Sequence, residues 1–102
     1  MDEKLKDTVP PHNDEAEQAV LGAMLLDWSS VGTVATMLTH EHFYTKHNQV
    51  IYKSLLSLYS QNIQGDTITL IAELNKQNLL DDAGGTAYVA SLTDKVPTSV
   101  NI

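Results

Sequence analysis

The chain has 102 residues and a formal net charge of −7, with 13 acidic side chains against six lysines and no arginine. A chain of this length can form one small domain with its own hydrophobic core. The absence of cysteine excludes disulfides and thiolate metal sites, and no apolar run approaches the roughly 20 residues that a membrane span needs. The scattered lysines argue against DNA or RNA binding by this domain alone, since nucleic-acid binders present a basic face.

The N-terminal residues 1–12 are polar and acidic and end in a pair of prolines. A residue before proline avoids the helical region, so this segment is predicted to be a flexible lead. Its polar, acidic composition is not that of a signal peptide. A helical domain is expected over 13–102. The missing cysteines and the missing signal peptide together predict a cytoplasmic protein without a membrane anchor.

The first helix is expected to begin at Asn13 or Asp14, whose side chains can cap it, and to run to about residue 26. Gly22 lowers helix propensity by about 1 kcal/mol, so its expected role is to let a neighbouring helix approach closely. The predicted apolar face is made of residues at helical spacing: Ala16, Ala19, Val20, Ala23, Met24 and Leu26.

Capping residues and the helical spacing of apolar side chains predict two more helices. Ser29 or Ser30 is expected to cap a second helix over 31–38. The turn THEHFY comes next, and its Phe43 and Tyr44 are predicted to anchor it to the core. A third helix is predicted over 47–61, with an inner stripe at i, i+4 and i+7 spacing: Ile51, Leu55 and Leu58.

The last two helices complete an all-α domain of five helices and short turns. Asp66 is a good cap for the segment TITLIAELNKQ, where period 3.6 outweighs the β-branched start. The inner face of this segment is predicted at Ile68, Ile71 and Leu74. The final helix is expected over 86–94, and Pro97 ends it.

Gly84 and Gly85 raise the question of a phosphate-binding loop, because glycines that open a helix can cradle a phosphate. A Walker-type loop also needs a lysine followed by a hydroxyl residue, and a dinucleotide fingerprint needs three spaced glycines after a strand. Neither set is present. The pair is therefore interpreted as a loop with one residue of positive φ before a helix, and no nucleotide or cofactor site is expected in this chain.

The histidines His40, His42 and His47 are the candidates for a metal site. A zinc site needs three or four ligands held on fixed elements, and HEH in a turn is not the HExxH pattern of a helix. Capping and surface hydrogen bonds are the expected roles, and no metal or catalytic residue is assigned. A helical module without catalytic residues is expected to bind other proteins.

Three blocks of the sequence in this order carry a resemblance: PPHNDEAEQAVLGAMLLD, then HFY, then DTITLIAELNKQNLLDDAGGTAYVASLTDKVPTSVNI. They closely resemble the N-terminal domain of the DnaB-type replicative DNA helicases of bacteria, over about residues 10–102. The resemblance implies a compact orthogonal bundle that forms the head of that domain. A helical hairpin and an ATPase domain would follow beyond the end of this chain.

The resemblance also implies a role in DNA replication. Such helicases form a hexameric ring around single-stranded DNA and unwind the fork with ATP and magnesium bound by the ATPase domain. The N-terminal domains form a collar, dock primase and take part in loading by a helicase loader. This chain alone would not be an enzyme, and without the hairpin it is expected to be a monomer in dilute solution.

By position, Tyr88 and Glu15 are the candidates for primase binding, with Tyr88 favoured because aromatic residues are enriched at binding hot spots. Without a binding role, Tyr88 is interpreted as a half-buried packing residue with its hydroxyl in water. Glu15 is interpreted as an acid in the first turn of a helix. A stand-alone metal-binding regulator that uses His40, His42 and His47 is the alternative function.

Three positions depart from the family's usual pattern. Asn48 stands where a histidine is common, Gly65 where a branched apolar residue usually precedes the aspartate, and Trp28 where proline is frequent. All three are predicted to affect local capping at helix ends. Trp28 is expected to act as a staple across a turn between helices.

Overall fold

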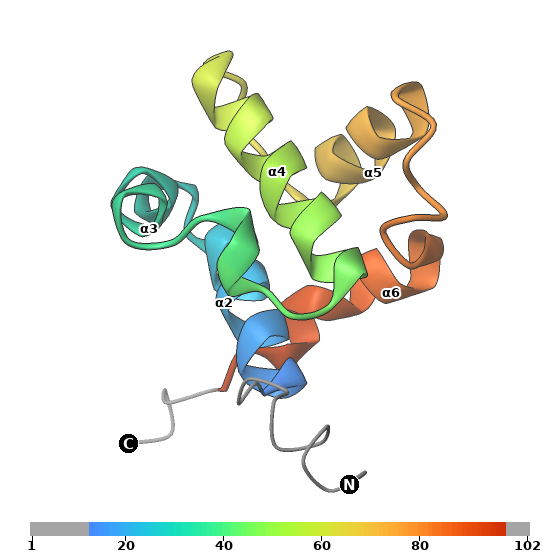
Figure 1. The fold of residues 1–102 in the computed structure, drawn as a ribbon. Coiled ribbons are helices and arrows are strands. Elements are labelled where there is room, and N and C mark those ends of the chain that lie inside the picture. Colours follow the sequence, from blue (N-terminus) through green and yellow to red (C-terminus); the bar gives the residue numbers. More distant parts are fainter. Residues whose placement is uncertain (1–12, 98–102) are drawn as a thin grey trace, which may run out of the picture.

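A computed structural model describes residues 13–97, and every regular element in this range is helical. Figure 1 shows the arrangement of these helices. The five α-helices, which confirm the predicted all-α fold, are α2 (Asp14–Leu26), α3 (Val31–Met37), α4 (Lys46–Ser60), α5 (Thr67–Lys76) and α6 (Gly85–Ser91). Short 3₁₀ turns connect or extend them at Trp28–Ser30, His40–His42 and Leu92–Lys95. The predicted lead, residues 1–12, and the chain end beyond residue 97 lie outside the described range.

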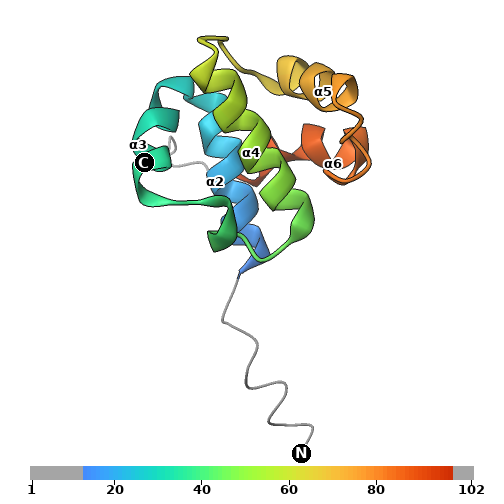
Figure 2. The same ribbon diagram turned by 45° about the horizontal axis from the view of Figure 1, so that its top comes forward.

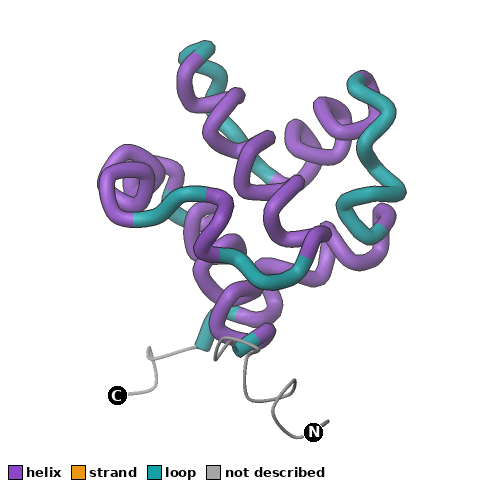
Figure 3. The backbone as a smooth tube through the Cα atoms, viewed as in Figure 1, coloured by secondary structure: helices purple, strands orange, loops and turns teal. Residues whose placement is uncertain are grey.

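Helix α4 lies at the centre of the bundle. It contacts α2, α3 and α5, while α6 packs against α5 and the Leu92–Lys95 turn packs along α2. Figure 2 shows α3 on one side of α4 and the pair α5 and α6 on the other. The tube view in Figure 3 shows that short loops join successive helices. This central position brings side chains of α4 against several other helices.

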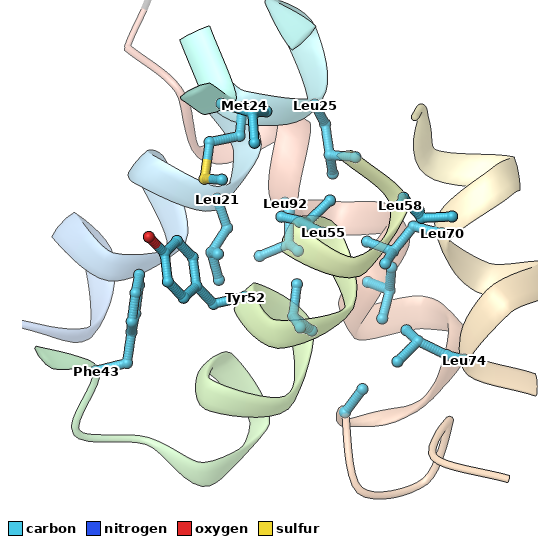
Figure 4. Packing of buried hydrophobic residues seen from close by; sticks show 14 residues of the cluster. Leu21, Met24, Leu25, Phe43, Tyr52, Leu55, Leu58, Leu70, Leu74 and Leu92 are labelled. Carbon is cyan, nitrogen blue, oxygen red and sulfur yellow. The ribbon is translucent and has the colours of Figure 1, made fainter. Parts of the chain in front are cut away.

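The hydrophobic core fills the space around α4, and Figure 4 shows its packing. Tyr52 is fully buried, its ring lies 4.9 Å from that of Phe43, and its hydroxyl donates a 2.7 Å hydrogen bond to the Leu38 carbonyl. The buried apolar residues come from every helix: Leu21, Met24, Leu25, Val31, Phe43, Ile51, Tyr52, Leu55, Leu58, Leu70, Leu74, Ala83, Val89 and Leu92. This core fixes the helices that carry the polar sites.

Gly22 has the close-packing role that the sequence predicts. It is buried on α2, and a Cβ added there would overlap the backbone carbonyl of Leu92 and lie 2.9 Å from the Val96 side chain. The Leu92–Lys95 turn can thus lie directly on the α2 backbone. Any side chain at this position would push the two segments apart.

The inner faces of α2 and α5 were predicted only in part, since Met24 and Leu74 are fully buried as expected but Leu26 and Ile68 are not. In α2, Leu21 and Leu25 are buried, whereas Leu26, placed on the inner face from the sequence, is 62% exposed. In α5, Leu70 is fully buried and Ile68 is 79% exposed. Both helices carry apolar residues on more than one side. Periodicity alone therefore does not determine which of these sides the neighbouring helices cover.

The turn and cap predictions are partly correct. Phe43 is buried as expected, but Tyr44 is 51% exposed and does not anchor the turn in the core. Asn13 and Asp66 cap α2 and α5 by accepting hydrogen bonds from backbone amides. Ser30 occupies the N-cap position of α3, as predicted, but its hydroxyl makes no capping bond and donates to the Asp27 carbonyl.

No single helix in residues 13–97 is long and apolar enough to cross a bilayer. Only α2 taken together with the segment Trp28–Met37 meets the length and composition test, and that pair is bent by 114°.

We expect Gly22→Ala to destabilise the chain by about 1–3 kcal/mol, because the new methyl group would overlap the Leu92 carbonyl. Helix propensity alone predicts the opposite effect, an increase in the free energy of unfolding by about 1 kcal/mol. Urea unfolding followed by circular dichroism measures the difference. Ala72→Gly, at an exposed position of α5, is the control and should cost about 1 kcal/mol. A Gly22→Ala chain more stable than the parent would contradict the close contact.

Candidate functional site: a polar junction of three helices

A chain of hydrogen bonds joins α2, α4 and α6 at one end of the bundle. Glu17 of α2 accepts a 2.8 Å bond from the side-chain amide of Asn48 in α4, and Asn48 in turn accepts one from the hydroxyl of Tyr88 in α6. The second oxygen of the Glu17 carboxylate accepts a 2.8 Å bond from the backbone amide of Tyr44. We call Glu17, Asn48 and Tyr88 the polar junction.

Asn48 is the centre of the junction and is fully buried. An asparagine amide has a donating and an accepting end, and each is matched here, by a carboxylate and by a hydroxyl. A buried polar group without a partner costs roughly 1–3 kcal/mol. No buried side-chain nitrogen or oxygen in the described range lacks a partner, so the junction forms without that penalty.

Tyr88 is held on several sides. Gly84 has a φ of +97°, and a Cβ added to it would lie 2.7 Å from the Tyr88 ring. The ring of His47 lies edge-on at 5.5 Å. Both Gly84 and Gly85 have positive φ, where one such residue is predicted. Gly84 therefore leaves room for the tyrosine ring, and both glycines supply the positive φ of the turn into α6.

Burial raises the pKa of Tyr88, and the nearby charges of Asp14 and Glu17 act in the same direction. Hydrogen bonding with Gln18 and Asn48 opposes this shift of the pKa in part. The hydroxyl is thus a bonded, neutral donor at physiological pH. Tyr88 is half-buried as expected, but its hydroxyl does not lie free in water because it bonds Asn48.

Glu15 lies apart from the polar junction. It is exposed on the side of α2 that faces the Leu92–Lys95 turn, where it lines a groove of about 440 Å³ together with Ala19, Asp94 and Lys95. No hydrogen bond, ion pair or ring contact joins it to Tyr88 within residues 13–97. The two residues singled out from the sequence therefore belong to two different surfaces.

The three histidines do not form a ligand set. His42 accepts a 2.9 Å hydrogen bond from the Thr39 backbone amide through its ring, as part of a capping box. His47 packs its ring against Tyr88. Among the described residues, no group of three or more His, Asp or Glu side chains could hold a metal ion. No contact in this range favours the metal-binding alternative.

Comparison with known proteins decides the family. Residues 9–102 match the family described as the DnaB-like helicase N-terminal domain. The chain belongs to this family. It is 44% identical over 100 residues to the replicative DNA helicase DnaB of Treponema pallidum, and 38% identical over 102 residues to the replicative DNA helicase DnaC of Bacillus subtilis.

A solved structure agrees with the fold of this DnaB-type domain. The crystal structure of the N-terminal domain of DnaB helicase from Mycobacterium tuberculosis is 38% identical, with a TM-score of 0.81 over 90% of this chain and 64% of that one. The chain spans 23% of the Treponema helicase and 22% of the Bacillus helicase. It corresponds to the N-terminal domain of a replicative DNA helicase.

Two departures from the DnaB-type pattern lie against each other. The ring of Trp28 packs onto Gly65, where any Cβ would overlap it, and its centroid lies 6.1 Å from that of Tyr59. A branched residue at 65 and a tryptophan at 28 are therefore incompatible in this geometry. Trp28 thus ties the turn between α2 and α3 to Tyr59 of α4 and to Gly65, which agrees with the expected staple role, and a glycine at 65 leaves room for its ring.

The third departure, Asn48, lies in the first turn of α4, as predicted, but its side chain does not cap the helix and bonds Glu17 and Tyr88 instead. It lies on the buried side of α4, one turn before Ile51 and Tyr52 and two turns before Leu55. This spacing was the available sequence signal, because a polar residue in phase with a buried stripe must find a partner. Sequence reasoning missed Glu17 as well, since an acid in the first turn of a helix has an adequate local explanation.

We expect Tyr88→Phe to lower the free energy of unfolding by about 1–2 kcal/mol, because it leaves the Asn48 carbonyl oxygen without its donor. Tyr59→Phe is the matched control, since the Tyr59 hydroxyl has no hydrogen-bond partner in the described range. That change should stay within about 0.5 kcal/mol. Urea unfolding of both variants measures the difference, and equal effects would show that the junction contributes nothing.

The parent chain and Tyr88→Phe should also differ in how their stability depends on pH. A pKa raised in the folded state means that the folded chain holds the Tyr88 proton more tightly than the unfolded chain does. The stabilising contribution is complete below the ordinary tyrosine pKa of about 10 and is lost as the pH rises through the folded value. The stability difference between the parent and Tyr88→Phe should therefore shrink above about pH 10. A constant difference across that range would contradict the shift.

Proposed function

We propose that this chain is the head of the N-terminal collar of a replicative DNA helicase and a docking domain for primase. The observation that carries the proposal is the family match over residues 9–102, supported by the likeness to the solved Mycobacterium domain. The role of such a head is geometric. A rigid helical module keeps the ring subunits in register and presents a fixed surface to partners.

In the full-length protein, the motor activity would come from the ATPase domain that follows. That domain would bind ATP and magnesium and would drive unwinding of DNA at the replication fork. The subunits would assemble as a hexamer around single-stranded DNA, with a helicase loader acting during assembly. The acidic charge of the head, −7, supports contact with proteins here and leaves the DNA to the ring. The cytoplasm, where bacterial chromosomes replicate, is the proposed site of action.

Tyr88 is the stronger candidate for the primase contact. Its hydroxyl, backbone turn and ring edge are all fixed before a partner arrives, so little side-chain entropy remains to be lost on binding. Aromatic side chains in such settings are frequent hot spots. Glu15 is exposed in the first turn of α2 and would give at most a contact at the rim.

The test is a calorimetric titration of the C-terminal domain of the cognate primase into this chain. A longer chain that includes the following helical pair is titrated in parallel. Binding by both chains places part of the docking surface on the head, and Tyr88→Ala should then weaken binding by at least about tenfold, or 1.4 kcal/mol. Tyr59→Ala, a partly exposed tyrosine near the other end of α4, should leave binding unchanged.

The remaining outcomes are equally informative. Binding only by the longer chain assigns docking to the helical pair and leaves the head a structural role, as two weak sites can act only together. If neither chain binds, the primase part of the proposal fails while the family assignment stands. Equal losses in Tyr88→Ala and Tyr59→Ala would point to unfolding and not to a local contact.

A further inference from the structure

A second surface lies between α4 and the connection that leads from α5 to α6. It is a groove of about 320 Å³. Figure 1 shows α5 and this connection on one side of α4. Its lining comes from one stripe of α4 and from the connection opposite: Lys46, Val50, Lys53, Ser54, Ser57, Gln77, Leu79 and Asp82. We call these residues the α4 groove.

The α4 groove concentrates positive charge in an acidic domain. Two of the four lysines in the described range, Lys46 and Lys53, line it, against a single carboxylate from Asp82. Both lysines are exposed, and no ion pair joins either to a carboxylate in residues 13–97. Seven residues separate them, which is about 10 Å along a helix. Val50 lies between them, and Leu79 lies on the connection opposite.

Ser54 supplies a hydroxyl among the residues that line the α4 groove. The residue is only 3% exposed, and its hydroxyl makes no hydrogen bond in the described chain. Since no fully buried side-chain oxygen in that range is unpartnered, this hydroxyl must reach solvent, and the groove that Ser54 lines is the opening available. A hydroxyl placed in this way can bond a ligand without breaking a bond in the protein.

We propose that the α4 groove binds a short acidic segment of a partner protein. One apolar side chain of the segment packs between Val50 and Leu79. Carboxylates on either side of it pair with Lys46 and Lys53, and Ser54 bonds a polar atom of the same segment. An extended peptide advances about 3.3 Å per residue, so three or four residues cover the distance between the two lysines.

The composition of the α4 groove favours an acidic peptide over a nucleic acid. Single-stranded nucleic acid sites combine a positive track with aromatic rings on which bases stack. The groove has no aromatic residue and carries Asp82 on its far wall. The apolar pair Val50 and Leu79 instead suits a leucine-sized side chain, for which a phosphate backbone has no equivalent.

The experiment selects a phage-displayed library of random linear peptides on the immobilised 102-residue chain. We expect enriched sequences to carry acids on both sides of an apolar residue. Synthetic peptides of those sequences should bind about tenfold more weakly to the double variant Lys46→Glu, Lys53→Glu, because two attractive pairs become repulsive. Each single variant, Lys46→Glu or Lys53→Glu, should bind more weakly than Lys95→Glu, which makes the same charge reversal outside the groove and should bind as the parent does.

Ser54→Ala separates recognition from folding. The Ser54 hydroxyl has no bond to lose in the free chain, so unfolding by urea should be unchanged while peptide affinity falls several-fold. The proposal is overturned if no sequence is enriched, if the enriched peptides are neutral or basic, or if the lysine double variant binds them as well as Lys95→Glu does. Displacement of an enriched peptide by a single-stranded oligonucleotide would assign the groove to nucleic acid instead.

Discussion

The arrangement of α2, α4 and α6 depends on Asn48, because this buried amide can be satisfied only when a carboxylate and a hydroxyl meet it from two other helices. Apolar packing tolerates small rotations of a helix, whereas a hydrogen bond weakens steeply when its angle changes. The leucine-rich core thus supplies most of the driving force. The polar junction selects one relative orientation of the three helices among those that the core would accept.

Glycine positions complete this selection through contact distance. At Gly22 the Leu92–Lys95 turn rests on the backbone of α2, and at Gly84 the ring of Tyr88 rests on the turn before α6. Both contacts fix the path of α6 relative to α2, one at each end of the helix. The hydroxyl of Tyr88 reaches Asn48 only along that path. The residue proposed to contact primase is thus also part of the folding constraint, so its variants need a stability control.

The sequence predicted what depends on local physics and missed what depends on distant neighbours. The caps at Asn13 and Asp66 and the existence of five helices follow from residues close together in the chain. The buried face of α5 does not, because Ile68 and Leu70 are both apolar and only the neighbouring helices decide between them. The polar junction joins residues 31 and 40 positions apart, and no local pattern reports such pairing. Only the phase of Asn48 within α4 gave a sign of it.

The α4 groove and the polar junction occupy different sides of α4, and their electrostatics differ in kind. A net charge of −7 repels an acidic segment at long range, while Lys46 and Lys53 attract it over a distance near the Debye length of about 8–10 Å. The long-range repulsion would make association of an acidic segment slow, and the local attraction would make it selective for the groove. Salt weakens both the repulsion and the attraction. Binding strength would have to come from short-range fit, and in the proposed collar several copies of the head would raise it by multivalency. A weak groove on a single head is therefore consistent with a strong contact on that proposed collar.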